Sequence, residues 1–210
     1  MPFIGNQPAK VPLTSADITD GIITNADIAN STINLTTKVT GVLPVANGGT
    51  NLSSGFANGI TMADQWRVTT NVVGTGGAIT ANWERVDTDS GGIIGTGMTE
   101  SSGVFSFPST GIYLVNISSF VTAAAARLYA GIYIVVSTDN FSTNSVATEC
   151  FGSIYNTDAY AQLSGSFLLD VTSTANTKVR FDIAASGTST YEGNTTVNRL
   201  HATFTRLGDT

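Results

Sequence analysis

Charged residues are scarce in this chain. They make up 11% of its 210 residues, against about 25% in ordinary soluble domains. The 15 acidic residues outnumber the 9 basic ones, which leaves a net charge of −6 at pH 7. A chain that is acidic and has no basic patch is not expected to bind nucleic acid.

Cysteine and histidine each occur once, as Cys150 and His201. An intrachain disulfide is therefore impossible, and a metal site built from His/Cys clusters is excluded. A catalytic triad would have to use His201, but this residue lies on the polar side of the last predicted strand. We expect it to be a surface or subunit-interface histidine. We expect Cys150 to be a small buried apolar side chain, with a reactive thiol as the alternative.

Long apolar runs are absent too. No stretch approaches the roughly 18 apolar residues of a membrane-spanning helix, and the first residues lack the basic and apolar regions of a secretory signal. We therefore expect a protein that is made in the cytoplasm and inserts into no membrane. Apolar residues still make up 41% of the chain, which is not a disordered composition.

The chain does have a repeat near its N-terminus. A large aliphatic residue recurs every five positions, at Leu13, Ile18, Ile23, Ile28 and Ile33. This period matches neither a helix face nor a flat strand. It is typical of a β-solenoid or of one chain of a threaded multi-strand stem, and such units bury their aliphatic side only against neighbours. We expect residues 1–36 to be an attachment or stem segment.

Residues 37–62 form a Gly/Asn-rich linker, in which Asn47-Gly48-Gly49 is a turn signal and Pro44 argues against a central strand. From 63 to 210 the sequence predicts short strands separated by polar turns. The predicted strands lie at 104–107, 111–121, 132–136, 163–171, 179–183 and 199–205. The predicted fold class is therefore all-β, an antiparallel sandwich or barrel.

Alternation along these strands predicts which side chains face the core. The predicted core includes Phe105, Tyr113, Val115, Ile117, Ile134, Phe167, Leu169, Phe181 and Phe204.

Several polar clusters contain the residue types of ligand sites. The segment 87–92 has paired acids but no glutamate at the EF-hand spacing, so we expect a polar turn. The glycines at 74, 76 and 77 precede no helix, which predicts a loop that does not bind phosphate. Glycoside hydrolysis would need two carboxylates, and no spacing singles out a pair among Glu149, Asp158 and Glu192. We expect no enzyme activity, no cofactor and no metal.

The segment Phe105-Ser106-Phe107-Pro108-Ser109-Thr110-Gly111-Ile112-Tyr113 resembles the Phe-x-x-Pro-x-x-Gly-x-Tyr signature of complement-type and tumour-necrosis-factor-like jelly-roll heads. The closing Phe204-Thr205-Arg206-Leu207-Gly208 resembles their last core strand. The resemblance covers roughly residues 80–208. It implies a ten-strand jelly roll that works as a homotrimer and binds ligands without catalysing a reaction.

The segment Leu43-Pro44-Val45-Ala46-Asn47-Gly48-Gly49-Thr50 resembles a motif that precedes the distal head of bacteriophage tail-fibre proteins, with Asn51 where glycine is usual. The opening Met1-Pro2-Phe3-Ile4-Gly5-Asn6-Gln7-Pro8, with the Ala-Asp-Ile repeats after it, is similar to the starts of virion structural proteins of marine podoviruses. These resemblances imply a short trimeric phage fibre or spike on the virion. Its N-terminus would join other virion proteins, and its head would bind a host surface glycan or protein.

Two alternatives stay open. The first alternative is a decoration or connector protein of the capsid or tail, whose head packs on other virion proteins. The second is a polysaccharide-cleaving spike. Host contact is expected on head loops, at 152–160 with Tyr155, Asp158 and Tyr160, and at 186–195 with Tyr191 and Glu192. Tyrosine offers an apolar face and a hydroxyl. The competing interpretation is that these tyrosines pack at the trimer seam.

Overall fold

The computed structural model describes residues 14, 16, 18–29, 60–157 and 159–210. The chain divides into two units, Met1–Ala57 and Asn58–Thr210, which are described separately. Leu13, Ile33, Asp158 and the tail-fibre-like motif lie outside the described residues. The predicted linker falls largely outside them as well, and its last residue, Met62, is the first residue of a strand.

In the first unit, the described residues form turns and 3-10 segments, among them the short 3-10 helix η2 (Asn25–Asp27). The Thr24 amide and hydroxyl donate to Asp27 Oδ2 at 2.8 and 2.7 Å, and these hydrogen bonds lower the pKa of Asp27. The repeat residues Ile18, Ile23 and Ile28 are exposed. Within this chain their apolar side chains therefore remain in contact with water.

The second unit is all-β in its described residues, as predicted, and every strand pairing in it is antiparallel. Its strands are β1 (Met62–Val68), β2 (Val72–Ala78), β3 (Trp83–Arg85), β4 (Thr99–Ser101), β5 (Val104–Ser106), β6 (Gly111–Thr122), β7 (Arg127–Ser137), β8 (Ser145–Ile154), β9 (Ala161–Val171), β10 (Lys178–Tyr191) and β11 (Leu200–Gly208).

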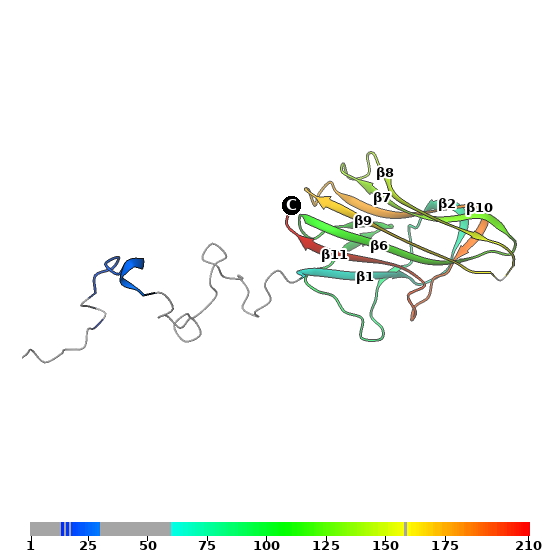
Figure 1. Cartoon of the computed structure of the whole chain (residues 1–210). Helices are drawn as coiled ribbons and strands as arrows, with labels where there is room; N and C mark the ends of the chain where they lie inside the picture. Colours follow the sequence, from blue (N-terminus) through cyan, green and yellow to red (C-terminus); the bar gives the residue numbers. More distant parts are fainter. Residues whose placement is uncertain (1–13, 15, 17, 30–59, 158) are drawn as a thin grey trace, which may run out of the picture. The chain divides into compact units, whose positions relative to one another are not determined.

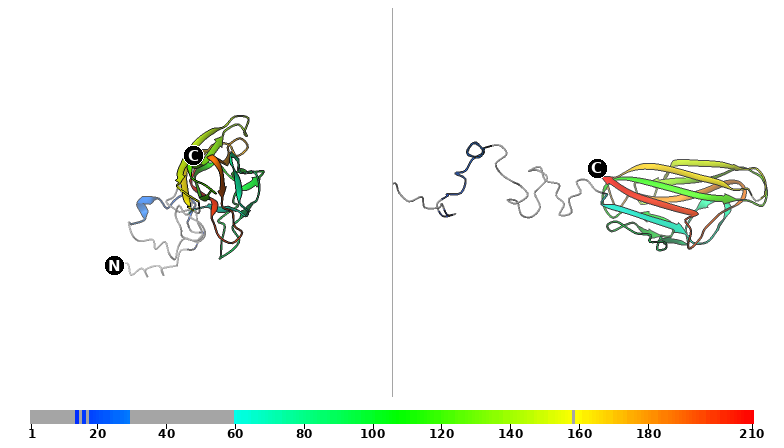
Figure 2. Two further views of the ribbon diagram at one scale, coloured as in Figure 1. Left: turned by 90° about the vertical axis from the view of Figure 1, so that its right-hand side faces the viewer. Right: turned by 60° about the horizontal axis from the view of Figure 1, so that its bottom comes forward.

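The strands lie in two facing layers (Figure 1). One layer has the order β3–β1–β11–β6–β9, and its four long strands run side by side in the right-hand view of Figure 2. The other layer has β10 paired with β2 and β7, and β8 paired with β7. The last residues of β10 also pair with the end of β6, which joins the two layers at one corner. This arrangement is the predicted antiparallel jelly-roll sandwich.

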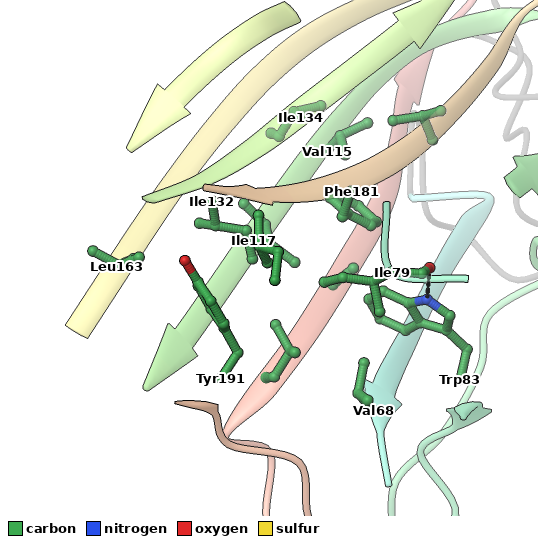
Figure 3. Close-up of a cluster of buried hydrophobic side chains, with 14 of the residues drawn as sticks. Val68, Ile79, Trp83, Val115, Ile117, Ile132, Ile134, Leu163, Phe181 and Tyr191 are labelled. Carbon is green, nitrogen blue, oxygen red and sulfur yellow. Dashed lines mark hydrogen bonds between the residues drawn. The ribbon is translucent and has the colours of Figure 1, made fainter. Parts of the chain in front are cut away.

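The core fills the space between the layers (Figure 3). Eight of the nine predicted core residues are buried, and Phe167 is partly buried against the same cluster. Phe204 lies at its centre, with its ring centroid 5.0 Å from that of Phe105 and 6.1 Å from that of Phe181. Trp83 also belongs to the core and donates from its indole nitrogen to the Ile79 carbonyl at 3.0 Å.

The jelly-roll signature has a structural explanation at the start of β6. Gly111 has φ +140, and a Cβ there would lie 2.5 Å from the Gly208 carbonyl oxygen, so only glycine fits. Two residues on, the ring centroid of the buried Tyr113 lies 4.7 Å from that of Phe107. The Tyr113 hydroxyl donates a hydrogen bond to the Ser109 carbonyl oxygen at 3.0 Å. The spaced aromatic and glycine residues thus fix the corner that leads into β6.

The prediction of a glycine loop at 74–77 is wrong. Gly74, Gly76 and Gly77 were expected in a loop, but they belong to β2, which pairs with β10. Glycine is depleted in strands, and sequence propensity therefore argued against one here. Pairing with β10 overrides that propensity, and a Cβ on Gly76 would stand 3.4 Å from the Ile183 carbonyl oxygen.

Candidate interaction surfaces

The outer face of β11, β6 and β9 is uncharged across its middle. Burial alternates along β6 and β11, so every second residue faces away from the core. The pairing aligns three rows of such residues across β11, β6 and β9: Thr205–Leu114–Leu168, Thr203–Asn116–Ser166 and His201–Ser118–Ser164. None of these described positions is Asp, Glu, Lys or Arg. Charge is depleted in the same way at the centre of protein–protein interfaces.

His201 occupies this face, as the sequence predicted. It lines a hollow of about 190 Å³ with Asn116, Ser118, Ser164 and Thr203. Burial lowers the pKa of its imidazole, which keeps the ring neutral at pH 7. Its Nδ1 is buried and has no hydrogen-bond partner among the residues that the structure describes. The three rows therefore carry no permanent charge, and His201 Nδ1 is a buried polar atom that a partner outside the chain could hydrogen-bond.

Two of the predicted host-contact tyrosines are exposed. Tyr155 and Tyr160 are 79% and 63% exposed, in the connection between β8 and β9. The Thr157 hydroxyl donates to the Ala124 carbonyl at 3.0 Å, which ties this connection to the one between β6 and β7. Neither tyrosine has a ring contact within the described residues. Asp158, predicted beside them, lies outside those residues.

The prediction for Tyr191 is wrong. It was placed in a loop at 186–195, but β10 runs on to Tyr191, whose side chain is 0% exposed. Its hydroxyl lies 2.9 Å from the carbonyl oxygens of Gly131 and Ala184, both acceptors, and burial raises its pKa to about 12. The polar run before it resembles a turn, yet β2 pairs with it. Glu192 follows the strand and forms an ion pair with Arg199.

A cluster that the sequence reasoning missed lies on β7 and β8. Tyr129 and Tyr133 share the outer face of β7, and Phe151 of β8 contacts both. Tyr129 is 42% exposed and Phe151 is 50% exposed. These residues lie on strands, whereas the sequence predicted contact residues in the turns between strands.

The segment 87–92 is a polar turn, as expected. Its Asp87 carboxylate accepts from Arg67 Nη2 at 2.8 Å, and the buried Arg67 also donates from Nε to Glu84 at 2.7 Å. The acid is therefore used to hold the turn against β1. Within the described residues no group of three or more His, Cys, Asp or Glu could hold a metal ion.

Cys150 is half-buried in β8, and burial raises the pKa of its thiol. A Cβ added to Gly165 of β9 would lie 2.2 Å from Cys150 Sγ. The sulfur thus fits over a glycine and packs β8 against β9. No helix in the described part of the chain is long and apolar enough to cross a membrane.

No protein-family model matches the chain, and no curated protein matches it. Solved structures do match. The Eiger TNF of S. frugiperda is 12% identical over 72% of this chain and 95% of its own, with a TM-score of 0.57. Murine APRIL at pH 5.0 is 15% identical over 70% of this chain and 98% of its own, with a TM-score of 0.50. At such identities the likeness shows the fold alone, a tumour-necrosis-factor-like jelly roll.

Proposed function

We propose that this chain is a non-enzymatic structural protein of a bacteriophage virion, a short homotrimeric fibre or spike whose jelly-roll head contacts the host cell surface. The head would be presented on the particle surface, and residues 1–36 would join it to other virion proteins. The proposal combines the jelly-roll fold with the tail-fibre-like motif and the N-terminal resemblance, which stand in the order expected of a fibre.

The observation that carries the trimer is the uncharged outer face of β11, β6 and β9. Bringing charged faces of an acidic chain together would cost desolvation and repulsion. Rows of Thr, Ser, Asn and Leu avoid both costs, and closed rotational symmetry repeats the same contact around the axis. Three copies around one axis would also offer partners to His201 Nδ1, which lacks one among the described residues of a single copy.

The attachment role rests on the N-terminal repeat. Ile18, Ile23 and Ile28 are exposed within the chain, and covering such aliphatic side chains is favourable by about 25 cal/mol per Å². A neighbouring virion protein or the same segment of another copy would cover them.

Sedimentation equilibrium of the whole chain tests the assembly. The expected mass is three times the 21.7 kDa of one chain, and a clean monomer at micromolar concentration would refute the trimer. Deleting residues 1–36 should leave a folded trimeric head that no longer joins particles. If the shortened protein still incorporates, the N-terminus is not the attachment end.

Immunogold labelling of particles then separates the fibre from the decoration protein. Antibodies against the head should label a projecting tip. Label confined to the capsid or tail wall would favour a connector whose head packs on other virion proteins. Release of reducing ends from host polysaccharide would instead favour a cleaving spike.

A further inference from the structure

The outer face of β7 and β8 carries three aromatic side chains, Tyr129, Tyr133 and Phe151, here called the aromatic platform, in which Phe151 contacts both tyrosines. The Phe151 ring centroid lies 5.6 Å from each tyrosine ring, with interplanar angles of 88° to Tyr129 and 78° to Tyr133. The three residues line an open hollow of about 330 Å³. This is at the lower end of the roughly 300–1,000 Å³ of small-ligand sites.

The sheet builds this platform through a glycine. Alternation along β7 puts Tyr129, Gly131 and Tyr133 on one face, and the register sets Phe151 opposite Gly131. A Cβ on Gly131 would lie 2.6 Å from two atoms of the Phe151 ring. Only the missing side chain lets Phe151 lie over the β7 backbone between the tyrosines.

The support beneath the platform is rigid. The Tyr191 hydroxyl lies 2.9 Å from the Gly131 carbonyl oxygen on the core side, and β7 is paired on both edges, with β10 and β8. Aromatic side chains held on a paired strand lose little conformational freedom when a ligand binds. An exposed ring cluster of this kind marks a contact site more strongly than single exposed apolar residues do.

The charged residues that pair directly with the platform are both acidic. Glu149 of β8 pairs across from Tyr133, and it raises the pKa of that tyrosine in addition to the larger effect of burial. On the other side, Asp182 pairs with Tyr133 but is neutralised by Arg180, whose Nε donates to it at 2.9 Å. No Lys or Arg is among the three described residues that line the hollow. An anionic ligand would meet the Glu149 carboxylate beside the rings, while the guanidinium of Arg127, two residues before Tyr129, donates to the Ala126 and Thr188 carbonyl oxygens.

We propose that the aromatic platform binds a neutral sugar residue, a hexose or N-acetylhexosamine unit of a surface glycan. The apolar C–H face of a pyranose ring would stack on Phe151 and Tyr129. The sugar hydroxyls would donate to the Glu149 carboxylate and exchange hydrogen bonds with the tyrosine hydroxyls. This assignment rests on the proposed host-contact function, and it replaces the loop tyrosines as the contact site.

A cationic ligand fits the geometry less well. A quaternary ammonium group is held where ring faces surround it. Here the rings pack edge to face on one another and form an open surface, which suits a flat ring laid across it. A second copy of the chain is the other competing occupant, and the sedimented mass of the platform variants would reveal it.

The test is binding of the whole chain to a printed array of neutral hexose and N-acetylhexosamine oligosaccharides, beside sialylated and sulfated glycans and a phosphocholine conjugate. Neutral glycans should bind, and Tyr129→Ala/Tyr133→Ala should weaken binding at least tenfold. Gly131→Ala should weaken it as well, because it displaces Phe151 while keeping all three rings. The matched control is Tyr155→Ala/Tyr160→Ala, which removes two more exposed tyrosines outside the platform and should bind like the parent.

Sedimented mass and melting temperature of each variant accompany the array. The proposal is overturned if the trimeric parent binds no neutral glycan, if it prefers the anionic glycans or phosphocholine, or if the platform variants bind like the parent. A platform variant that loses the oligomer assigns the rings to a subunit seam and also overturns it. A parent protein that is itself monomeric contradicts the proposed function, whereas a trimeric parent that binds no neutral glycan contradicts only this inference.

Discussion

Replacing Phe204 by alanine should remove more stability than any change on the outer face of the same strand. Phe204 is fully buried, and its ring centroid lies 5.0, 6.1 and 6.5 Å from those of Phe105, Phe181 and Phe107. These partners come from β5, β10 and the segment after β5, and β5 pairs with β10, so a cavity at Phe204 would loosen contacts between the two layers. Truncating a buried phenylalanine costs about 3–5 kcal/mol. For a unit of about 150 residues this corresponds to a fall in Tm of roughly 6–20 °C.

Thermal unfolding followed by circular dichroism, at one fixed protein concentration, measures this effect; the concentration is fixed because Tm depends on it for an oligomer. Thr205→Ala is the control, since Thr205 is the next residue and faces away from the core. It should cost less than about 1 kcal/mol. Phe204→Leu keeps most of the apolar volume and should fall between the two. A Phe204→Ala protein that melts with the parent would refute the argument that this ring holds the layers together.

Three further changes have calculable directions. Asp64→Ala should cost roughly 3–5 kcal/mol in chemical denaturation, because the buried Asp64 carboxylate accepts from Trp66, Arg85 and the Met98 amide; Asp64→Asn should cost less. The stability that Tyr191 contributes should be complete below pH 10 and lost as the pH rises towards 12, on the order of 2–3 kcal/mol, and a Tyr191→Phe protein should lack this alkaline slope. Burial lowers the pKa of His201, so the stability that His201 contributes should be present above pH 6.5 and lost as the pH falls further. An unchanged sedimented mass and stability at pH 5, with His201→Gln indistinguishable from the parent, would contradict this.

The long strands could be predicted because their burial repeats every second residue. Along β6 a buried side chain alternates with a half-buried one from Gly111 to Thr122, and the sequence shows the same alternation. The residues of the jelly-roll signature could be recognised in the sequence for a related reason. Gly111 and Tyr113 each meet a local steric or hydrogen-bonding demand at the corner before β6, and such demands restrict residue type position by position.

The glycine strand and the end of β10 could not be predicted, because their order comes from pairing and not from their own composition. Gly74 and Gly76 have no strand propensity, and Ser186 to Thr190 has the composition of a turn. Gly76 pairs with Ala184, and Val73 and Gly74 pair with Thr190 and Ser189, on the two sides of a register shift between Ala184 and Ser189. Each segment would be irregular alone, and the hydrogen bonds between them make both extended.

The aromatic platform divides into a part that the sequence could have indicated and a part that it could not. Tyr129, Gly131 and Tyr133 have the opposite parity to the buried Ile132 and Ile134, so two outward tyrosines flanking a glycine could have been noticed. The position of Phe151 above Gly131 depends on the register between β7 and β8, which shifts twice along their length. Parity within one strand carries no information on that register. The general expectation that contacts lie on loops therefore pointed away from a surface that two paired strands create together.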